Sequence, residues 1–295
     1  LVFEGNNKWM LSANGTIFTY EYEAIIPGLL KRWYEERQEM QRKMRECGDN
    51  EIEREYWDKR QLVKKINLNS LYGAILNPGC RFFDIRIGQS VTLTGRCITK
   101  HMASKVNEIV TGEYDHKGES IVYGDTDSVY FSAYKTLQKE IKDGLIPWTK
   151  DSVVGLYDKI SEEVNSSFKS FMTKAFHTPA TRGEVIAAGR ELVASKGLFI
   201  TKKRYAVLYY DKEGKRTDVE GKEGKMKAMG LDLKRSDTPV FVQDFLSEIL
   251  YMVLSGNEEK KVLDRISEFR AEFKAMPGWE KGSPKRANNM TKYTA

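Results

Sequence analysis

Cysteine is scarce in this chain, with three residues among 295, and no two of them form a CxxC pair. We therefore expect neither a zinc site built on paired cysteines nor a disulfide framework, and a reducing compartment fits this composition. No apolar run reaches the length of a membrane span and no segment resembles a signal peptide, so a membrane role is not expected. The chain begins at Leu1 rather than at a methionine, from which we expect a fragment or a processed piece.

Charge of one sign is not in large excess either. There are 48 basic and 42 acidic residues, for a net charge of +6. This mild positive charge permits binding of nucleic acid but does not establish it, because the clustering of charges matters more than their total. The apolar content of 40% is typical of a globular protein, and 295 residues suffice for one large domain or a few small ones.

Residues 121–131 read I-V-Y-G-D-T-D-S-V-Y-F, which is two β-prone runs around a tight turn. Asp is a poor strand former and a good turn residue, so the pattern predicts a β-hairpin whose tip carries Asp125 and Asp127. Two carboxylates this close repel one another unless a cation lies between them, and hard oxygen ligands suit Mg²⁺ together with substrate phosphates. The hairpin is thus a candidate metal platform for phosphoryl chemistry.

Two other interpretations of this acidic turn stay open at this point. A G-D-T-D-S sequence is often only a solvated turn with hydrogen bonds from its Asp side chains. A calcium loop of the EF-hand type would need Gly at its sixth position, and counting from Asp125 that position is Tyr130, which argues against calcium.

Residues 24–77 predict two long charged helices, the first ending at about Glu46 and the second running from about Glu51 to Leu76. The C-G-D-N sequence at residues 47–50 breaks them apart, so they should form an antiparallel hairpin. Such a hairpin cannot bury itself fully, and it is either a solvated arm or a lever that contacts a ligand.

Lys65, Asn69 and Tyr72 are spaced i, i+4 and i+7 on the second of these helices, so they line one face. Gly73 follows directly and removes bulk, and Asn77 lies one further turn along. A lone Lys would be read as part of a solvated face. An ammonium, an amide and a phenol on one stripe instead favour a nucleotide-facing surface, with the ammonium on phosphates and the phenol stacked on a base or sugar.

Arg37 lies on the first of the two helices, at nearly the same distance from the turn as Lys65. At about 1.5 Å per residue the two would differ by only about 6 Å along the arm. Provided that the hairpin forms, both side chains can grip one triphosphate.

Residues 201–210 read T-K-K-R-Y-A-V-L-Y-Y and predict a strand in which Lys203 and Tyr205 share one face and Arg204 takes the other. A K-K-R run is usually only solvated. Here it is embedded in a β-prone segment with an aromatic residue interleaved, which favours a surface for a nucleic-acid backbone. Lys227 would extend that surface.

Strands and helices are also predicted in the rest of the chain. Val91 and Val106 are expected to face a core from the helix that carries them. The elements are strands over residues 9–12 and 16–20, helices over 88–110, 151–176, 238–255 and 258–274, a strand-rich stretch over 184–210 and a mobile loop over 211–226.

Three motifs follow one another along the chain: K-K-I-N-L-N-S-L-Y-G at 64–73, Y-G-D-T-D-S at 123–128 and K-K-R-Y at 202–205. In their order and spacing the chain resembles the family B DNA polymerases, and most of all those of T-even-type tailed phages. Residues 227–231 (K-A-M-G-L) and 236–239 (S-D-T-P) are similar to the palm-to-thumb junction of that family, and residues 287–289 (A-N-N) to a thumb segment.

The resemblance implies an α+β fold with three parts. The palm, an antiparallel sheet with helices on one face, would comprise residues 1–23 and 78–232. A two-helix fingers hairpin would comprise residues 24–77, and residues 233–295 would start a helical thumb.

The resemblance also implies two-metal nucleotidyl transfer from a deoxynucleoside triphosphate (dNTP) to a primer 3′-hydroxyl. Asp127 would coordinate both Mg²⁺ ions with Asp125 beside it. Protonation of the leaving group by Lys65 is a further hypothesis of ours. Glu184 matches a carboxylate near the metal site by its distance before the K-x-Y motif.

The remaining implied roles are binding roles. The partners would be primer-template DNA, dNTP, the upstream polymerase and exonuclease portion and a sliding clamp, in the cytoplasm of an infected bacterial host. Nucleotide binding would fall to Arg37, Lys65, Asn69, Tyr72 and Gly73, and DNA binding to Lys203, Arg204, Tyr205, Lys227 and Asn77.

The chain also departs from the family pattern. Gln41 stands where the family has a second Lys on the first fingers helix, and no D-x-x-S-L-Y-P segment with the other metal Asp occurs. We expect the exonuclease domain and most of the thumb of that family to lie outside this sequence as well. We therefore expect the chain alone to polymerise poorly or not at all. It would be a piece of a one-chain polymerase, a subunit of a split polymerase, or a DNA-binding module that has lost catalysis.

Overall fold

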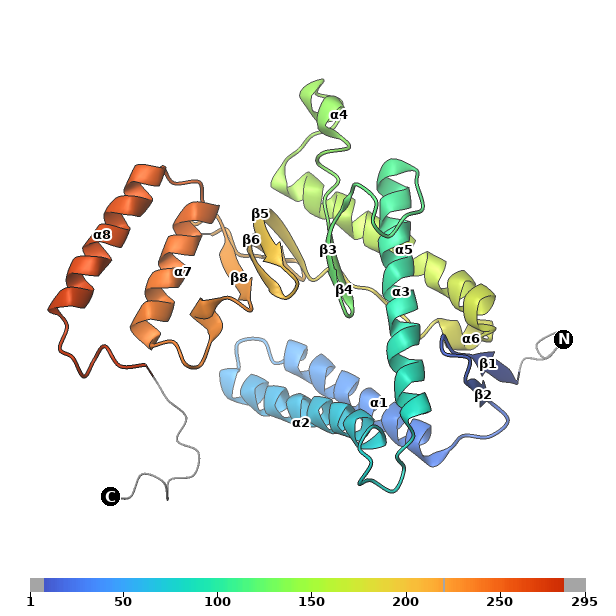
Figure 1. Cartoon of the computed structure of the whole chain (residues 1–295). Coiled ribbons are helices and arrows are strands. Elements are labelled where there is room, and N and C mark those ends of the chain that lie inside the picture. Colours follow the sequence, from blue (N-terminus) through green and yellow to red (C-terminus); the bar gives the residue numbers. More distant parts are fainter. Residues whose placement is uncertain (1–7, 220, 284–295) are drawn as a thin grey trace, which may run out of the picture. The chain divides into compact units, whose positions relative to one another are not determined.

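The computed structural model describes residues 8–219 and 221–283, so the A-N-N segment lies outside the described residues. Leu1–Phe131 with Val164–Ala187 make one compact unit, and Ser132–Glu163 with Ala188–Ala295 make a second. Figure 1 shows helices and small antiparallel sheets, which confirms the predicted α+β class. The two units divide the chain differently from the palm, fingers and thumb ranges, which stay predictions. No helix among the described residues is long and apolar enough to cross a membrane.

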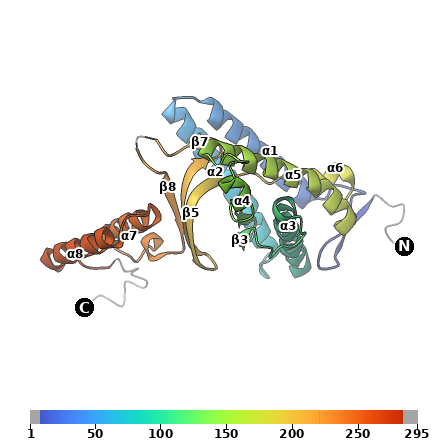
Figure 2. The same cartoon turned by 90° about the horizontal axis from the view of Figure 1, so that it is seen from above.

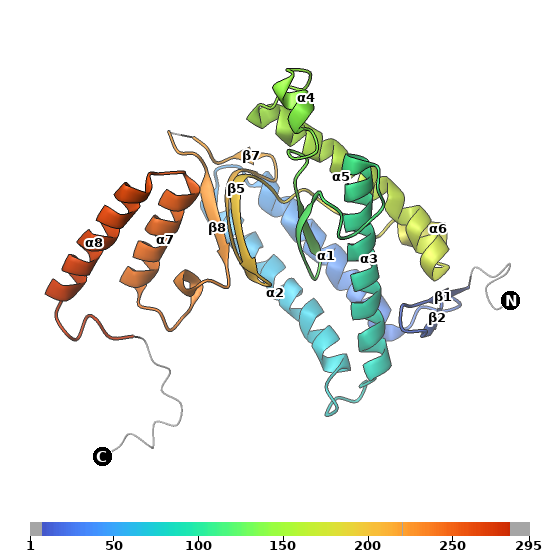
Figure 3. The same ribbon diagram turned by 45° about the horizontal axis from the view of Figure 1, so that its top comes forward.

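The arm of the first unit consists of two long helices, α1 (Ile25–Glu46) and α2 (Glu51–Ile75), which lie side by side in Figures 1 and 3. Asn50 caps α2, because its side chain accepts a hydrogen bond from the backbone N–H of Glu53 at 3.2 Å. Every residue of α1 keeps part of its surface exposed. The predicted, incompletely buried helical hairpin is therefore confirmed.

The long helix α3 (Ile85–Thr111) follows the arm. The side chain of Asp84 caps it by accepting from the backbone N–H of Arg86 at 2.9 Å. Hydrogen bonds from the Arg86 guanidinium, and then from its backbone N–H, lower the pKa of Asp84 to about 2. Val106 is buried as predicted, but Val91 is 54% exposed, so its predicted core position is wrong. The apolar periodicity shows which residues share a helix face but not which part of that face is covered by other elements.

The two short strands predicted near the N-terminus are confirmed as β1 (Trp9–Leu11) and β2 (Ile17–Thr19), and they pair antiparallel. Their turn is attached to α3, because the backbone N–H of Ala13 donates to Oγ1 of Thr94 at 3.1 Å. The other elements of the first unit are β3 (Ile121–Asp125), β4 (Ser128–Phe131) and α6 (Ala180–Gly183).

Helix α5 (Lys150–Phe176) contributes residues to both units, and its second half packs on α3 through His101. The imidazole stacks on Phe171 with 4.0 Å between ring centroids. Its nitrogens lie 2.7 Å from the Tyr114 hydroxyl and 2.9 Å from the Ser167 hydroxyl. Burial lowers the pKa of His101, so this histidine serves the core as a neutral, hydrogen-bonded ring.

The second unit is built on a four-stranded antiparallel sheet in which one strand pairs with the other three. On this strand, Ala206 and Leu208 are fully buried and pack with Leu254, while Tyr210 packs with Val153. The strands are β5 (Leu192–Thr201), the central β6 (Arg204–Lys212), β7 (Lys215–Arg216) and β8 (Lys225–Met229).

Two further helices of this unit, α7 (Val240–Leu254) and α8 (Glu259–Ala275), lie side by side in Figures 1 and 3 and overlap in the view of Figure 2. Phe245 stacks on Phe269 between them, with 3.7 Å between the ring centroids. Both helices predicted in this region are thus confirmed. The remaining elements are α4 (Gln138–Lys142) and the 3₁₀ turn η1 (Asp232–Lys234).

The lysine-tyrosine segment is not the continuous strand that the sequence predicts. β5 ends at Thr201 and β6 begins at Arg204, so Lys202 and Lys203 form a tight turn, in which Lys203 has a left-handed φ of +61°. The prediction that Lys203 and Tyr205 share one strand face is therefore wrong. β-prone residues on both sides of K-K allow a strand or a hairpin, and the pairing of β5 with β6 selects the hairpin.

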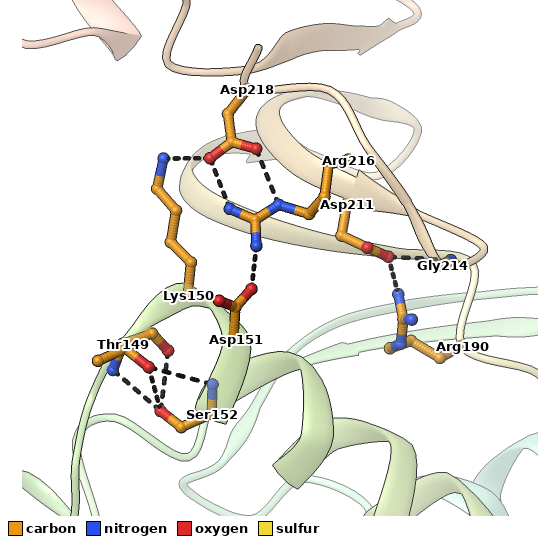
Figure 4. Close-up of polar contacts among 9 residues, drawn as sticks. All are labelled: Thr149, Lys150, Asp151, Ser152, Arg190, Asp211, Gly214, Arg216 and Asp218. Carbon is orange, nitrogen blue, oxygen red and sulfur yellow. Dashed lines mark hydrogen bonds and ion pairs between the residues drawn. The ribbon is translucent and has the colours of Figure 1, made fainter.

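Residues 211–226, predicted as a mobile loop, are in part structured and anchored to the start of α5 (Figure 4). Arg216 binds Asp218 at 2.7 Å and also contacts Asp151, and Lys150 donates to Asp218 at 2.6 Å. Hydrogen bonds from Arg216 and then from Lys150 hold the pKa of Asp218 well below its usual range. Arg216 and Asp218 of this stretch therefore belong to an ion-pair network with Lys150 and Asp151.

Gly230, which follows β8, allows a test of how closely the backbone there approaches the turn before β6. Its φ is +62°, and a Cβ added there would lie 2.0 Å from the carbonyl oxygen of Lys203. We expect Gly230→Ala to destabilise the second unit by about 2 kcal/mol or more, because a left-handed backbone and a steric clash both oppose the side chain. Urea unfolding followed by circular dichroism measures the change.

Gly155→Ala is the matched control. Gly155 lies inside α5, where an added Cβ meets no atom within 4 Å. Alanine should therefore be neutral there or stabilise the helix by up to about 1 kcal/mol. Equal stability of the two variants would contradict the close approach of Gly230 to Lys203.

Candidate active site

The acidic turn joins β3 to β4, which pair antiparallel with Asp125 opposite Ser128. Oδ1 of Asp125 accepts hydrogen bonds from the backbone N–H of Thr126 at 3.0 Å and from its hydroxyl at 3.1 Å. Asp127 is exposed and makes no hydrogen bond or ion pair with the residues that the structure describes. One carboxylate thus fixes the turn, and the other is available to a cation.

Helix α3 supports this turn from one side, and both strands of the hairpin run beside it (Figure 3). The hydroxyl of Thr99 donates to the carbonyl oxygen of Thr126 at 2.8 Å. Thr126 has a positive φ of +20°, which is unusual for a β-branched residue. The bond to Thr99 therefore holds a peptide unit between the two aspartates in a conformation that its own side chain disfavours.

The donor set suits a hard divalent cation only in part. Asp125 and Asp127 supply carboxylate oxygens, but within the described ranges no group of three or more His, Cys, Asp or Glu side chains could hold a metal ion. Glu184 instead binds Lys169 at 2.6 Å. A cation at the turn would need further oxygen ligands from water, phosphates or another carboxylate, which is the coordination that Mg²⁺ commonly adopts.

The predicted nucleotide-facing stripe lies on α2. Lys65 and Asn69 are exposed, and a Cβ added to Gly73 would meet no atom within 4 Å, so open space lies beside the stripe. Tyr72 is half-buried and its hydroxyl donates to the carbonyl of Gly88 on α3 at 3.1 Å. This bond fixes the phenol against α3.

Asn77 differs from the prediction. α2 ends at Ile75, so Asn77 does not lie one turn further along the helix but in the loop that follows it. Its side-chain oxygen accepts from the backbone N–H of Gly79 at 2.9 Å. The P-G pair ends the helix early, and Asn77 closes the resulting turn.

The side chain of Arg37 on α1 reaches across the hairpin to α2. Its Nε donates to Oε1 of Gln61 at 3.2 Å, and Gln61 lies one helical turn before Lys65. One turn is about 5.4 Å, in agreement with the small axial offset expected between Arg37 and Lys65. Arg42, next to Gln41, does not offer a replacement cation, because its guanidinium is bound by Glu39 and Glu46.

The lysine-tyrosine segment belongs to the second unit. Lys203 and Arg204 are exposed, and Arg204 lies 3.8 Å from Asp232. The ring of Tyr205 is only 6% exposed and stacks on Phe199 with 5.5 Å between centroids. Tyr205 therefore stabilises the hairpin that presents the two basic residues.

Lys227 is the fourth residue predicted to contact DNA in this unit. Its ammonium donates to Glu191 at 2.8 Å, and its side chain is 28% exposed. Binding of a phosphate there would have to compete with that ion pair.

Sequence reasoning missed two residues that the geometry adds. Gln61 precedes Lys65 and Asn69 at the same four-residue spacing, so extending the stripe by one turn would have found it. Thr99 has no such signal, because its contact with Thr126 joins residues far apart in the chain.

Comparison with known proteins gives one consistent result. The family model described as DNA polymerase family B matches residues 5–177 and 180–277. The DNA-directed DNA polymerase of Escherichia phage RB69 is 33% identical over 210 residues, which are 67% of this chain and 22% of that protein. That of Enterobacteria phage T4 is 30% identical over 245 residues, 79% of this chain and 26% of that protein. DNA polymerase 1 of Pyrococcus abyssi is 25% identical over 266 residues, 89% of this chain and 28% of that protein. The chain therefore spans about a quarter of the length of these relatives.

The support of the acidic turn by α3 can be tested with Thr99→Val, which keeps the shape of the side chain and removes its donor. Since the Thr126 carbonyl then loses its partner, we expect amide hydrogen exchange in residues 125–128 to become faster by about threefold to tenfold, the equivalent of a net hydrogen bond of about 1 kcal/mol. Hydrogen exchange followed by NMR gives this rate for each amide.

Thr92→Val is the control, because among the described residues the hydroxyl of Thr92 bonds only to carbonyls of its own helix, those of Gly88 and Gln89. It should leave the exchange of the acidic turn unchanged. If Thr99→Val and Thr92→Val had the same effect on residues 125–128, the turn would not depend on the contact from α3.

Proposed function

The chain belongs to DNA polymerase family B, and we propose on that basis that it contributes to template-directed addition of deoxynucleotides to a primer 3′-hydroxyl. The observation that carries this proposal is the exposed, unpaired Asp127 at the tip of the β3–β4 hairpin. The exposed Lys65 and Asn69 of α2 belong to the same unit. A cation platform and a phosphate-binding stripe are the two parts that nucleotidyl transfer requires.

For the metal site we propose Asp127 and Asp125 as ligands of Mg²⁺, with Glu184 joining them once it leaves Lys169. When bound, two Mg²⁺ ions would lower the pKa of the 3′-hydroxyl and neutralise charge on the leaving pyrophosphate. Asp127 is exposed and neither of its carboxylate oxygens bonds to a described residue, whereas one oxygen of Asp125 already accepts hydrogen bonds from Thr126. Asp127 is therefore the principal ligand in this proposal.

For the nucleotide we propose that Lys65, Arg37 and Asn69 bind the triphosphate of the incoming dNTP. The ammonium of Lys65 would also donate a proton to the leaving pyrophosphate. Tyr72 and Gly73 would pack against the nascent base pair. The open space beside Gly73 supports this, because a Cβ added there would meet no atom within 4 Å.

For DNA we propose that Lys203 and Arg204 bind phosphates of the primer strand, since the turn between β5 and β6 exposes both. Tyr205 would hold that turn in place from the core. Lys227 and Asn77 would bind DNA only after leaving the partners they have in this structure.

We also propose the wider assignments that the family resemblance implies. The palm would comprise residues 1–23 and 78–232, the fingers residues 24–77, and the thumb would begin at residue 233. Catalysis would require further carboxylates from an upstream polymerase portion, in the same chain or in a separate subunit. A sliding clamp would be a further partner, and the bacterial host cytoplasm the place of action.

Primer-template binding by this chain tests the proposal without depending on turnover. With a dideoxy-terminated primer, we expect Mg²⁺ plus the complementary dNTP to tighten DNA binding by about tenfold, a typical coupling free energy between two ligands. Asp127→Asn should abolish this gain, because the carboxylate that joins metal and nucleotide is lost. Fluorescence anisotropy measures the dissociation constant.

Asp143→Asn removes the same charge from an exposed position after α4 and should leave the gain intact. The salt dependence of binding separates the competing interpretation of a bare DNA-binding module, because each phosphate contact adds about −0.9 to the log-log slope on duplex DNA. Binding that kept this slope but ignored both Mg²⁺ and dNTP would favour the bare module and reject the proposal.

A further inference from the structure

The contact between Arg37 and Gln61 is part of a chain of three side chains across the arm. Nε2 of Gln61 donates to Oδ1 of Asp58 at 2.9 Å, one turn earlier on α2. Oε1 of Gln61 accepts from Nε of Arg37 at 3.2 Å. Because its nitrogen is bound to a carboxylate, the amide of Gln61 has to turn its oxygen toward the guanidinium.

This arrangement uses only one of the donor groups of Arg37. Its two terminal nitrogens, Nη1 and Nη2, make no hydrogen bond or ion pair with the described part of the chain. These two nitrogens form the planar fork that binds phosphate oxygens in pairs. A guanidinium held by its Nε thus keeps the phosphate-binding edge free and limits its rotation.

The acidic residue that precedes Arg37 on α1 is engaged elsewhere. Glu36, which precedes Arg37, forms an ion pair with Lys64 on α2. The hydrogen bond from Lys64 holds the pKa of Glu36 below its usual range, so this carboxylate stays charged and engaged. A neutral amide at position 61 also leaves the full positive charge of Arg37 available, which a carboxylate there would cancel.

We propose that Gln61 is a positioning residue of the triphosphate site: it holds Arg37 by Nε so that Nη1 and Nη2 act with Lys65, one turn further along α2. The proposal rests on the proposed function, because it assumes that the arm binds a dNTP. Gln61 itself does not touch the nucleotide.

Gln61→Met tests this role, because Met has nearly the same length and lacks the amide. We expect the dissociation constant for the complementary dNTP, in the complex with a dideoxy-terminated primer-template, to rise about twofold to tenfold. This is the effect of releasing one flexible side chain that then has to be ordered on binding. Gln38→Met, at an exposed position of α1, is the matched control and should leave the dissociation constant unchanged.

A double-mutant cycle separates positioning from a general effect on the arm. In an Arg37→Ala background, Gln61→Met should have no further effect, since the group that it positions is gone. An equal loss of affinity in both backgrounds, or no loss in the single variant, would overturn the proposal. NMR of the Arg37 Nε–H gives a readout that does not need dNTP, and its exchange with solvent should become faster only in Gln61→Met.

Two further variants distinguish a failure of the proposed function from a failure of the positioning role alone. If Arg37→Ala and Lys65→Ala both left dNTP affinity unchanged, the arm would not be a triphosphate site, and the proposed function would be rejected together with this inference. If those variants weakened dNTP binding while Gln61→Met did not, only the positioning role would be rejected.

Discussion

The carboxylate of Asp127 must remain charged, solvated and unpaired for the acidic turn to bind a cation, and the surrounding structure meets this constraint by local hydrogen bonds. Asp125 turns one oxygen back onto Thr126, and Thr99 holds the carbonyl of Thr126 from the side of α3. These contacts fix the backbone without using Asp127. A turn stabilised by a basic side chain instead would have had to neutralise the charge that the site requires.

The arm must also keep a charge unpaired, but there the charge is positive and belongs to Lys65. Several of its cations are neutralised by neighbouring glutamates, as Lys64 is by Glu36 and Lys59 by Glu55. Lys65 differs, because it is exposed and makes no ion pair with any residue that the structure describes. Ion pairs on an exposed surface contribute little stability, so their main effect here is to reduce the positive charge that Lys59 and Lys64 offer to a phosphate, while Lys65 keeps its own charge available.

The sequence predicted those parts of the fold that depend on local signals. The break at residues 47–50 and the alternation around Asp125 were sufficient to locate the arm and the acidic hairpin. It did not predict the turn at Lys203, because the choice between a strand and a hairpin depended on pairing with a distant strand. For the same reason the role of Thr99 was not predictable, because its contact with Thr126 joins distant parts of the chain. Gln61 was predictable, because it continues the helical spacing of Lys65 and Asn69.

The most direct test of the account is where a divalent cation binds to the chain in the absence of DNA. Mn²⁺ can replace Mg²⁺ as a paramagnetic probe, and it broadens the NMR signals of amides close to it. The account predicts that residues 124–128 broaden first and that Asp127→Asn abolishes this effect. Broadening that began at the glutamates of the arm, or that was unchanged in Asp127→Asn, would contradict it.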